Sequence, residues 1–343
     1  MADIRQRKKD HVELTVTEGT QYSQSSGFDR FNFVHNALPE VDYNEVSTEA
    51  TLLGRSFAFP LFISSMTGGY AEAGPVNAII AEFCEQFNLP FGVGSQRAML
   101  EDVSVIKTFS IVREKAPTAF IAANIGGAQL VGGFSKDAIM KITGSIEADA
   151  IIIHLNPLQE LMQPEGDTNF KGVLEGIEQL VNDAHVPVLV KETGAGISKY
   201  VAKRLLNAGV EVIDVAGAGG TSWAKVENYR SSNKNPNHSF DNWGIPTAQC
   251  IRDISSLQWE RSFELIASGG IRTAHDIAKS LCLGATFTAS AQPVIKAISE
   301  SGLEGLEILF EVWKKDLKII LTLLGCSTLK ELNSTHLIEK TDK

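Results

Sequence analysis

The sequence contains few cysteines, and their arrangement suggests neither a metal centre nor a disulfide framework. Its four cysteines, Cys84, Cys250, Cys282 and Cys326, lie far apart and form no CxxC motif. Zinc sites and disulfide-rich folds depend on closely and regularly spaced cysteines, so both are disfavoured. Scattered cysteines of this kind are typical of a reducing compartment, and we expect a cytoplasmic protein.

Long apolar runs and an excess of positive charge are also missing. The start, MADIRQRKKDHVELTV, lacks the apolar segment of a secretory signal, and the later run LKIILTLLG is too short to span a bilayer. Acidic residues outnumber basic ones, 41 against 31, and the formal net charge is −10. Such a surface repels the phosphates of nucleic acids. The sequence therefore predicts neither a nucleic-acid partner nor a membrane partner.

Eight short apolar runs alternate with segments whose apolar residues have helical spacing. The runs cover residues 60–66, 90–96, 119–126, 150–156, 187–193, 211–217, 263–270 and 285–293. Such alternation predicts parallel strands joined by helices, and eight units of this size predict a closed (β/α)8 TIM barrel. An open, doubly wound sheet is the alternative. No linker divides the chain, so we expect one domain with an N-terminal arm (1–59), a barrel (60–300) and a C-terminal helical tail (301–343).

Polar residues and glycines follow seven of these runs directly. The segments are SSMTGG, GSQR, ANIGG, HLNPLQE, KETGAG, DVAGAGGTSW and ASGGIR. A single Gly-Gly turn or a single histidine at a strand end is more often structural than functional. Barrel enzymes, however, build their sites from the loops that follow the strands. Seven such segments at one rim therefore predict a functional site there.

The segment SGGIR, after the seventh run, is suited to a phosphate group. The last two strands of a barrel often carry a phosphate site, where backbone amides approach the anion. Gly269 and Gly270 would allow that approach, and Arg272 would add a charge-assisted hydrogen bond. Arg272 is equally compatible with a surface position at the start of a helix.

Lys191 lies inside the apolar run PVLVKET, where a charge is costly to bury unless it meets an anion. A salt bridge to Asp214 or Glu192 would satisfy it, and so would an anionic or electron-poor cofactor. Side chains alternate along a strand, so Lys191 and Glu192 point to opposite sides, whereas His154 and Asn156 share one side.

A basic cluster, RQRKKDH, stands near the N-terminus of this acidic chain. A solvated terminus is the simpler interpretation. An arm that closes over a phosphorylated ligand is the functional one. The cluster consists of Arg5, Arg7, Lys8, Lys9 and His11.

Taken together, these motifs resemble one family, the type 2 isopentenyl diphosphate isomerases. The resemblance runs in order from about residue 5 to residue 293. Its most specific segments are HLNPLQE and AGGTSWAKVE, which are not general barrel motifs, and the others are RKKDH, SSMTGG, GSQR, ANIGG, QPEGDTNF, VKETGAGIS and ASGGIR.

The resemblance implies an FMN-dependent barrel that interconverts isopentenyl and dimethylallyl diphosphates, with Mg²⁺ and with reduced flavin that NADPH maintains. It also implies a homo-oligomer, a tetramer or an octamer. The residues that it assigns to FMN are Ser65, Met66, Thr67, Ser95, Asn124, Lys191, Thr221, Gly269, Gly270, Arg272, Ala291 and Gln292.

The resemblance also assigns the substrate and metal contacts. Glu160 becomes the Mg²⁺ ligand, while His154 and Gln159 orient the substrate and the flavin carries the proton chemistry. Asn156 stays undecided, with a turn-stabilising role preferred. The residues assigned to the diphosphate are Arg7, Lys8, His11, Ser95, Gln96, Arg97, His154 and Gln159.

Two other functions compete with isomerisation. An FMN-dependent 2-hydroxy acid oxidase uses a similar barrel, but its base histidine and carboxylate-binding arginine are missing from DVAGAGGTS. A flavin- or phosphate-binding barrel without catalysis is the second alternative. The polar segment at residues 229–242, within the connection 218–262, predicts a mobile lid, a subunit contact or an exposed loop.

Overall fold

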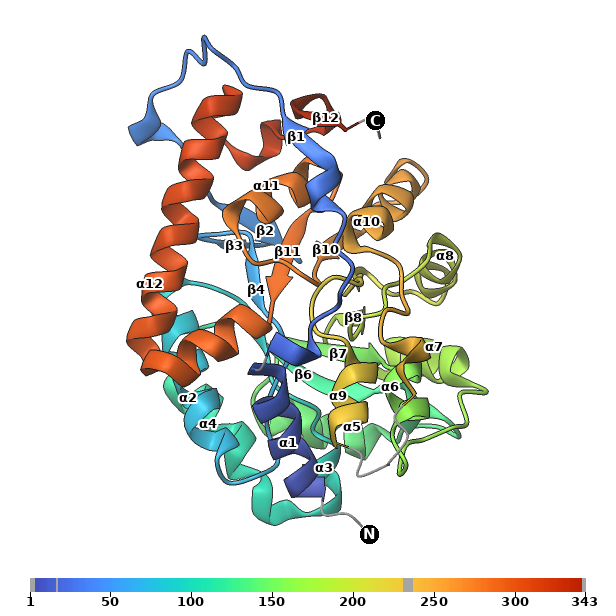
Figure 1. Ribbon diagram of the computed structural model, residues 1–343. Helices are drawn as coiled ribbons and strands as arrows, with labels where there is room; N and C mark the ends of the chain where they lie inside the picture. Colours follow the sequence, from blue (N-terminus) through green and yellow to red (C-terminus); the bar gives the residue numbers. More distant parts are fainter. Residues whose placement is uncertain (1–3, 17, 231–236, 341–343) are drawn as a thin grey trace.

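A computed structural model describes residues 4–16, 18–230 and 237–340, and its centre is a closed barrel of eight parallel strands (Figure 1). The barrel closes where Leu61 of the first strand pairs in register with Thr288 of the last. This closure confirms the predicted (β/α)8 fold and excludes an open sheet. The barrel strands are β4 (Leu61–Ile63), β5 (Phe91–Gly92), β6 (Ile121–Gly126), β7 (Ala150–Leu155), β8 (Val188–Glu192), β9 (Val212–Asp214), β10 (Glu264–Ala267) and β11 (Phe287–Ser290).

Helices surround the barrel, and one lies over its mouth. They are α1 (Ile4–Val16), α2 (Ala73–Phe87), α3 (Arg97–Glu101), α4 (Lys107–Lys115), α5 (Lys136–Gly144), α6 (Pro157–Met162), α7 (Val173–Asp183), α8 (Lys199–Asn207), α9 (Trp223–Arg230), α10 (Thr247–Ser255), α11 (Ala274–Cys282) and α12 (Gln292–Leu324). No helix in the described ranges has the length and apolar character needed to cross a membrane.

Short 3-10 turns join several of these elements. They are η1 (Glu18–Thr20), η2 (Phe28–Arg30), η3 (Tyr43–Glu45), η4 (Val103–Val105), η5 (Gly127–Leu130), η6 (His238–Phe240), η7 (Ser256–Trp259), η8 (Leu329–Glu331) and η9 (Ser334–His336).

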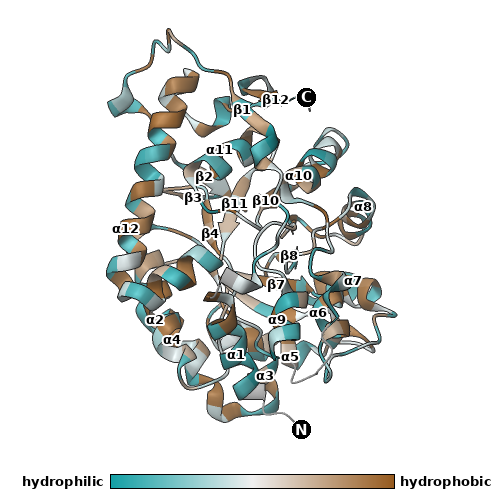
Figure 2. Ribbon diagram, in the orientation of Figure 1, coloured by the Kyte–Doolittle hydropathy of each residue, from teal (hydrophilic) through white to brown (hydrophobic). Residues whose placement is uncertain are grey.

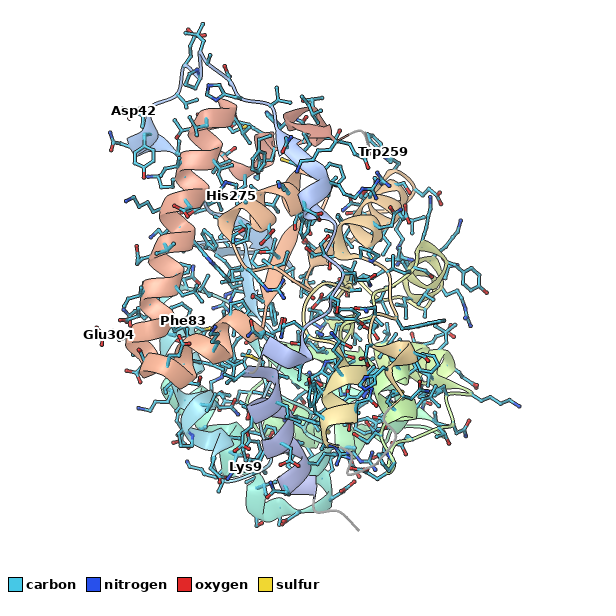
Figure 3. The ribbon with its side chains drawn as sticks, viewed as in Figure 1. Lys9, Asp42, Phe83, Trp259, His275 and Glu304 are labelled. Atoms are coloured by element: carbon cyan, nitrogen blue, oxygen red, sulfur yellow. The ribbon has the colours of Figure 1, made fainter. Side chains whose placement is uncertain are left out.

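Two apolar clusters hold the barrel together, one on each side of its strands. Strands buried on both faces read as continuous apolar runs, and for this reason the runs were visible in the sequence. The outer cluster joins strand residues such as Ile153 and Val190 to the surrounding helices. Helix α12 packs against α2 in this layer, where Phe83 and Phe310 meet with ring centroids 5.5 Å apart (Figure 3). Figure 2 shows apolar and polar segments alternating along α12, as expected for a helix with one buried side.

The arm closes the amino-terminal end of the barrel with a β-hairpin. Strands β2 (Ala50–Leu52) and β3 (Arg55–Phe57) pair antiparallel, and the turn residues Leu53 and Gly54 both have positive φ. Two residues with positive φ are characteristic of the tight hairpin turn that matches strand twist. Leu52 and Phe57 join the inner cluster with Phe62, Ile152 and Phe287, so they plug the barrel from below.

The C-terminal tail differs from the predicted helical tail. Helix α12 bends at Ser301 and Gly302 and ends at Leu324, because the next residue, Gly325, has the left-handed conformation with a φ of 74°. Beyond it, short 3-10 turns lead to β12 (Leu337–Glu339), which pairs antiparallel with β1 (Phe31–Phe33) of the arm. Residues 325–340 are therefore not α-helical.

The basic N-terminal segment forms helix α1, which lies beside α9 at the mouth of the barrel (Figure 1). Behind it, the arm follows the loop after β9: Tyr22 N–H donates to the Gly220 carbonyl at 2.9 Å, and Gln21 bridges to Thr221. The Arg5 side chain and residues 231–236 of the predicted lid lie outside the described part of the chain. Later in the same connection, the Trp243 carbonyl accepts a hydrogen bond from the Tyr22 hydroxyl at 2.8 Å.

Candidate functional site

Two neighbouring cavities open at the carboxyl ends of the barrel strands, each with a volume of about 160 Å³. The first, which we call the glycine cavity, lies between the ends of β4, β9, β10 and β11. The second, the basic cavity, lies between the ends of β4 to β8 and helix α1. The residues that line both cavities are His11, Ser65, Met66, Lys191, Thr193 and Trp223.

The far end of the glycine cavity is built from closely packed backbone. Gly269 and Gly270 have φ values of 94° and 76°, and a Cβ atom at Gly269 would lie 2.0 Å from the Gly217 carbonyl oxygen. Only glycine fits such a conformation and such an approach. Arg272 lines this end, with its guanidinium donating to the Gly219 carbonyl at 2.9 Å and to Gln21 Oε1 at 2.7 Å. Glycine backbone beside a fixed guanidinium suits a phosphate group.

A capping box fixes the loop that carries Arg272. The Asp276 carboxylate accepts the backbone N–H groups of Arg272 and Thr273, both at 3.0 Å, while the Thr273 side chain accepts the N–H of Asp276. Such reciprocal bonds define the first turn of α11. The local sequence RTAHD therefore holds Arg272 at the cavity wall.

Ser65, at the junction of the two cavities, carries an unsatisfied hydroxyl. Its Oγ atom is buried and has no hydrogen-bond partner among the described residues. Gly92 leaves room for it, since a Cβ atom there would lie 2.4 Å from this oxygen. A buried hydroxyl without a partner is costly, so this orphan atom fits a bound group with polar ring atoms.

Lys191 meets both cavities and forms no ion pair within the described chain. Its ammonium donates to the Glu192 backbone carbonyl. The Glu192 carboxylate points the other way and accepts four successive backbone N–H groups, from Thr193 to Gly196. Burial outweighs these bonds and raises the pKa of Glu192. The expected salt bridge to Asp214 or Glu192 is therefore wrong, and the Lys191 charge faces the cavities.

Lys8, from helix α1, brings a second ammonium into the basic cavity, and this group has no carboxylate partner in the described part of the chain. It donates to the carbonyls of Gly68 and Ser95, both at 2.8 Å. Burial, with repulsion from Arg7 as a further cause, lowers the pKa of Lys8 to about 7. An ammonium held by neutral carbonyls at a cavity wall is suited to an anionic ligand.

Glu227 of α9 anchors the arm over this cavity. Its buried carboxylate lies 2.8 Å from His11 Nε2 and accepts the Arg230 Nε–H at 2.7 Å. Although burial opposes ionisation, these bonds lower the pKa of Glu227 overall. The Gln163 amide, oriented with nitrogen toward Glu227 (3.3 Å) and oxygen toward Arg7 (3.1 Å), extends the connection. Helix α1 is thus tied to α9 by buried polar contacts.

The segment HLNPLQE forms the end of β7 and the start of α6. His154 Nδ1 lies 2.7 Å from Asn124 Oδ1, and burial, followed by the charges of Lys191 and Lys8, lowers the pKa of His154 to about 3. The imidazole is therefore neutral at physiological pH. Because Asn124 Oδ1 accepts the Nδ1 proton, Nε2 carries a lone pair and can accept a hydrogen bond but cannot donate one.

Asn156 brackets the next two polar side chains. Its amide donates to Gln159 Oε1 at 3.1 Å and to Glu160 Oε1 at 2.9 Å, and it makes no side-chain bond to the helix N-terminus. The other carboxylate oxygen of Glu160 accepts the Asp167 N–H at 2.7 Å. Asn156 thus orients Gln159 and Glu160 and does not stabilise the turn through its side chain.

Comparison with known proteins agrees with this arrangement. The model of the family described as FMN-dependent dehydrogenase matches residues 10–120 and 154–339. The isopentenyl-diphosphate delta-isomerase of Chlorobium limicola is 46% identical across 98% of this chain and 96% of its own length. That of a Nostoc species is 41% identical across 99% and 97%. The chain belongs to the isopentenyl-diphosphate delta-isomerases of the FMN-dependent dehydrogenase family.

Solved structures share the barrel of this isomerase family. A point mutant of flavocytochrome b2 has a TM-score of 0.72 with 17% identity, covering 96% of this chain and 83% of its own. A mandelate oxidase mutant has a TM-score of 0.64 with 17% identity, covering 97% and 92%. Likeness at this identity shows the fold alone, so the oxidase alternative gains no support beyond the shared barrel.

The predicted FMN residues of this isomerase divide between the two cavities. Thr67, Ser95 and Asn124 line the basic cavity and not the glycine cavity, because they follow β4, β5 and β6, away from β9 to β11. The predicted FMN residues that line the glycine cavity are Ser65, Met66, Lys191, Thr221, Gly269, Gly270, Arg272, Ala291 and Gln292.

The predicted substrate and metal residues gather in the basic cavity, with one exception. Gln96 is buried outside both cavities: its amide donates to the Ile142 carbonyl at 2.8 Å and accepts the Asn124 N–H at 3.0 Å. It joins the loop after β5 to β6 and α5 and lines neither cavity, so its assignment to the substrate is corrected. The predicted residues that line the basic cavity are Arg7, Lys8, His11, Ser95, Arg97, His154, Gln159 and Glu160.

No set of three or more His, Cys, Asp or Glu side chains in the described ranges could hold a metal ion. Among the residues that the structure describes, Glu160 alone offers a carboxylate to the basic cavity. Mg²⁺ commonly takes one or two carboxylates and completes its shell with water and phosphate oxygens. Such a donor fits Mg²⁺ that arrives with a diphosphate and does not fit a closed protein cage.

Several site residues were missed by sequence reasoning. Trp223 and Glu227 stand in AGGTSWAKVE, and Gln163 opens QPEGDTNF, so both segments carried a signal without a role. Gln21 and Gln129 carried no signal. Gln129 lines the basic cavity and donates to Asp167 at 3.0 Å, and only the fold brings it there.

Proposed function

We propose that this chain interconverts isopentenyl diphosphate and dimethylallyl diphosphate, with FMN in its reduced state and Mg²⁺ on the diphosphate. One observation carries the proposal: two cavities, each with one end whose residues suit an anion, share a wall made by Ser65, Met66, Lys191 and Trp223. A flavin nucleotide and a prenyl diphosphate each have one anionic end and one apolar or aromatic end. The shared wall would bring the two reactive ends together.

The glycine cavity is proposed to hold FMN, with Gly269, Gly270 and Arg272 at its phosphate and Ser65 and Lys191 at its ring. The orphan Ser65 hydroxyl and the unpaired Lys191 ammonium support this fit. Bound in its reduced state, FMN supplies a proton donor and acceptor for allylic carbons, which ordinary carboxylates serve poorly. NADPH is proposed only to bring the flavin to that state, since isomerisation has no net redox change.

The basic cavity is proposed to hold the substrate. Arg7, Lys8 and Arg97 would bind the diphosphate, and Glu160 would complete the shell of its Mg²⁺. Thr67, Ser95 and Asn124, predicted as FMN contacts, would face the region between the substrate and the flavin.

His154 and Gln159 are proposed to orient the substrate. Neutral His154 has no positive charge with which to bind the diphosphate, and its Nε2 lone pair accepts from a donor. Gln159 is held by Asn156 and lies 3.4 Å from Glu227. These residues exclude water from the basic cavity and hold the prenyl chain of the substrate against the shared wall. This is a positioning role.

The test uses purified protein, FMN, Mg²⁺ and isopentenyl diphosphate under anaerobic conditions, with the flavin oxidised or photoreduced. We expect dimethylallyl diphosphate from the photoreduced sample alone, and dependence on Mg²⁺ that Glu160→Gln shifts to higher concentration. Equal turnover by both redox forms would overturn the role of reduced flavin. Oxygen uptake with lactate or glycolate would favour an oxidase, and ligand binding without conversion would favour a sensor.

We further propose that copies of this chain assemble into a homo-oligomer, a tetramer or an octamer. Helix α12 supports this, because its outer side exposes Ile308 (58%), Val312 (50%) and Leu323 (45%). The labelled Glu304 marks that outer side (Figure 3). Light scattering should show that Val312→Glu lowers the assembly state, whereas Met140→Glu on α5 does not. An unchanged assembly state in Val312→Glu would remove α12 from the interface.

A further inference from the structure

A third, smaller cavity lies inside the barrel, directly below the junction of the other two. Its volume is about 10 Å³, close to what one water molecule needs. Ser65 and Lys191 line this cavity as well as the two above it. The lower cavity therefore reaches the same ammonium group that faces the glycine and basic cavities. Its remaining lining residues are Phe62, Ser64, Ile152, Leu189, Asp214 and Ile266.

Asp214 brings a carboxylate into this apolar chamber. It is the register partner of Lys191 on the neighbouring strand, and both side chains point into the barrel. A buried carboxylate at the end of a core strand is costly and needs a reason. None of the roles described so far uses it.

The hydrogen bonds of Asp214 leave one of its oxygens for the chamber. Both bonds that it accepts, from the Ser268 hydroxyl and from the Ala216 N–H, end on Oδ1. No hydrogen bond within the described residues ends on Oδ2. The carboxylate is thus fixed by β10 and by its own loop, with its second oxygen unused.

The titratable groups nearest to Lys191 and Asp214 lie on strands β7, β8 and β9. Lys191 on β8 stands between Asp214 on β9 and His154 on β7, and the three residues are in register. His154 is neutral, and the Glu192 carboxylate points out of the barrel into its own loop. Asp214 is therefore the carboxylate that shares the barrel interior with Lys191. Burial raises the pKa of Asp214, and the Lys191 charge opposes that rise.

We propose that Asp214 acts on the flavin through Lys191. Its carboxylate lies in register with Lys191 inside the barrel, offsets part of the lysine's positive charge, and so sets how much of that charge reaches a flavin ring in the cavity above. This inference rests on the proposed binding of FMN in the glycine cavity. Reduced flavin carries more negative charge than oxidised flavin, so a stronger positive field favours reduction. Asp214 weakens that field and holds the reduction potential of the flavin down.

The experiment measures the reduction potential of FMN bound to the holoenzyme, at one pH, in the wild type and in Asp214→Asn. The amide keeps the size of the side chain and an acceptor for Ser268, but it removes the charge. We expect the equilibrium to move toward reduced flavin by about tenfold, which is about 30 mV for a two-electron couple. Asp253→Asn, on α10 outside the barrel, is the charge-matched control and should leave the potential unchanged.

A double-mutant cycle separates an effect that depends on Lys191 from a direct effect of the Asp214 charge on the flavin. Lys191→Met should move the potential to more negative values, and Asp214→Asn in that background should add almost nothing. Two independent, additive shifts would overturn the inference that Asp214 acts through Lys191. If Asp214→Asn fails to fold, Asp214→Ser, which is also neutral at this position, should show the same shift of the reduction potential.

The outcomes also separate this inference from the proposed function. A wild-type chain that binds no FMN overturns both. A wild-type chain that binds FMN and isomerises its substrate, with an unchanged potential in both Asp214 variants, overturns only the role of Asp214.

Discussion

The imidazole of His154 is hydrogen-bonded to the side chain of Asn124, with Nδ1 lying 2.7 Å from Oδ1. The two residues occupy neighbouring strands, β7 and β6, at the point where both strands reach the basic cavity. The bond fixes the ring and its tautomer together. His154, which was predicted to bind the diphosphate, is therefore a neutral hydrogen-bond acceptor.

His154 should make the protein less stable in acid. Its pKa is about 3 in the folded protein and 6.5 in the unfolded chain, so between these values only the unfolded chain binds the proton. The free energy of unfolding should fall, as pH drops from 6.5 toward 3, by about 1.4 kcal/mol per unit from this group. Chemical denaturation at several pH values across that range measures this free energy, which should depend less steeply on pH in His154→Gln than in the wild type. The same pH dependence in both proteins would contradict the lowered pKa.

Lys8 should control substrate binding through its charge. Lys8→Met removes the ammonium from the basic cavity and should raise the KM for the diphosphate roughly 10- to 100-fold. Since the pKa of Lys8 is about 7, the wild-type kcat/KM should decline as pH rises through 7, and this step should vanish in the variant.

Lys9 provides the matched control for Lys8. It lies on the outer side of α1, where it pairs with Glu72 at 3.2 Å and lines neither cavity (Figure 3). Lys9→Met should leave the KM unchanged. An equal rise in both variants would mean that net charge, and not the place of Lys8, attracts the substrate.

Glu227 should hold helix α1 over the basic cavity. Glu227→Gln weakens the hydrogen bonds to His11 and Arg230 and removes the negative charge that balances Arg230. The attachment of α1 should lose about 2 kcal/mol of free energy. Hydrogen exchange of residues 4–16 should become roughly 30-fold faster. Asp10→Asn, which affects a bond to Gln6 within α1 itself, should change it little. Equal exchange in the wild type and Glu227→Gln would contradict the anchoring role.

Gln96 and its neighbour Arg97 should behave in opposite ways. Gln96→Leu leaves the buried Asn124 N–H on β6 without its acceptor and removes one donor from the Ile142 carbonyl on α5. It should lower the free energy of unfolding by about 1–3 kcal/mol at unchanged KM. Arg97→Gln should raise the KM with little effect on stability, because the arginine is half exposed and lines the basic cavity. Thermal unfolding and steady-state kinetics measure both. A raised KM in Gln96→Leu alone would restore its assignment to the substrate.

The strands could be predicted from the sequence because their signal is local. Residues such as those of AIIIHL are buried on both faces, so each strand appears as an unbroken apolar run. The signal for the predicted phosphate site was also local, because Gly269, Gly270 and Arg272 lie within four residues. The tail could not be predicted in this way. β12 exists because it pairs with β1, about 300 residues earlier in the chain.

The sequence by itself determined the eight strands, the order of the rim segments and the residue types suited to an anion, because apolar periodicity and glycine chemistry act over a few residues. Only the tertiary structure decided which cavity each residue serves. It buried the Gln96 side chain in the core, placed Glu227 in contact with His11, 216 residues away in the sequence, and placed Asp214 in register with Lys191. Contacts of this kind depend on barrel closure and on the path of the arm, which no local pattern encodes.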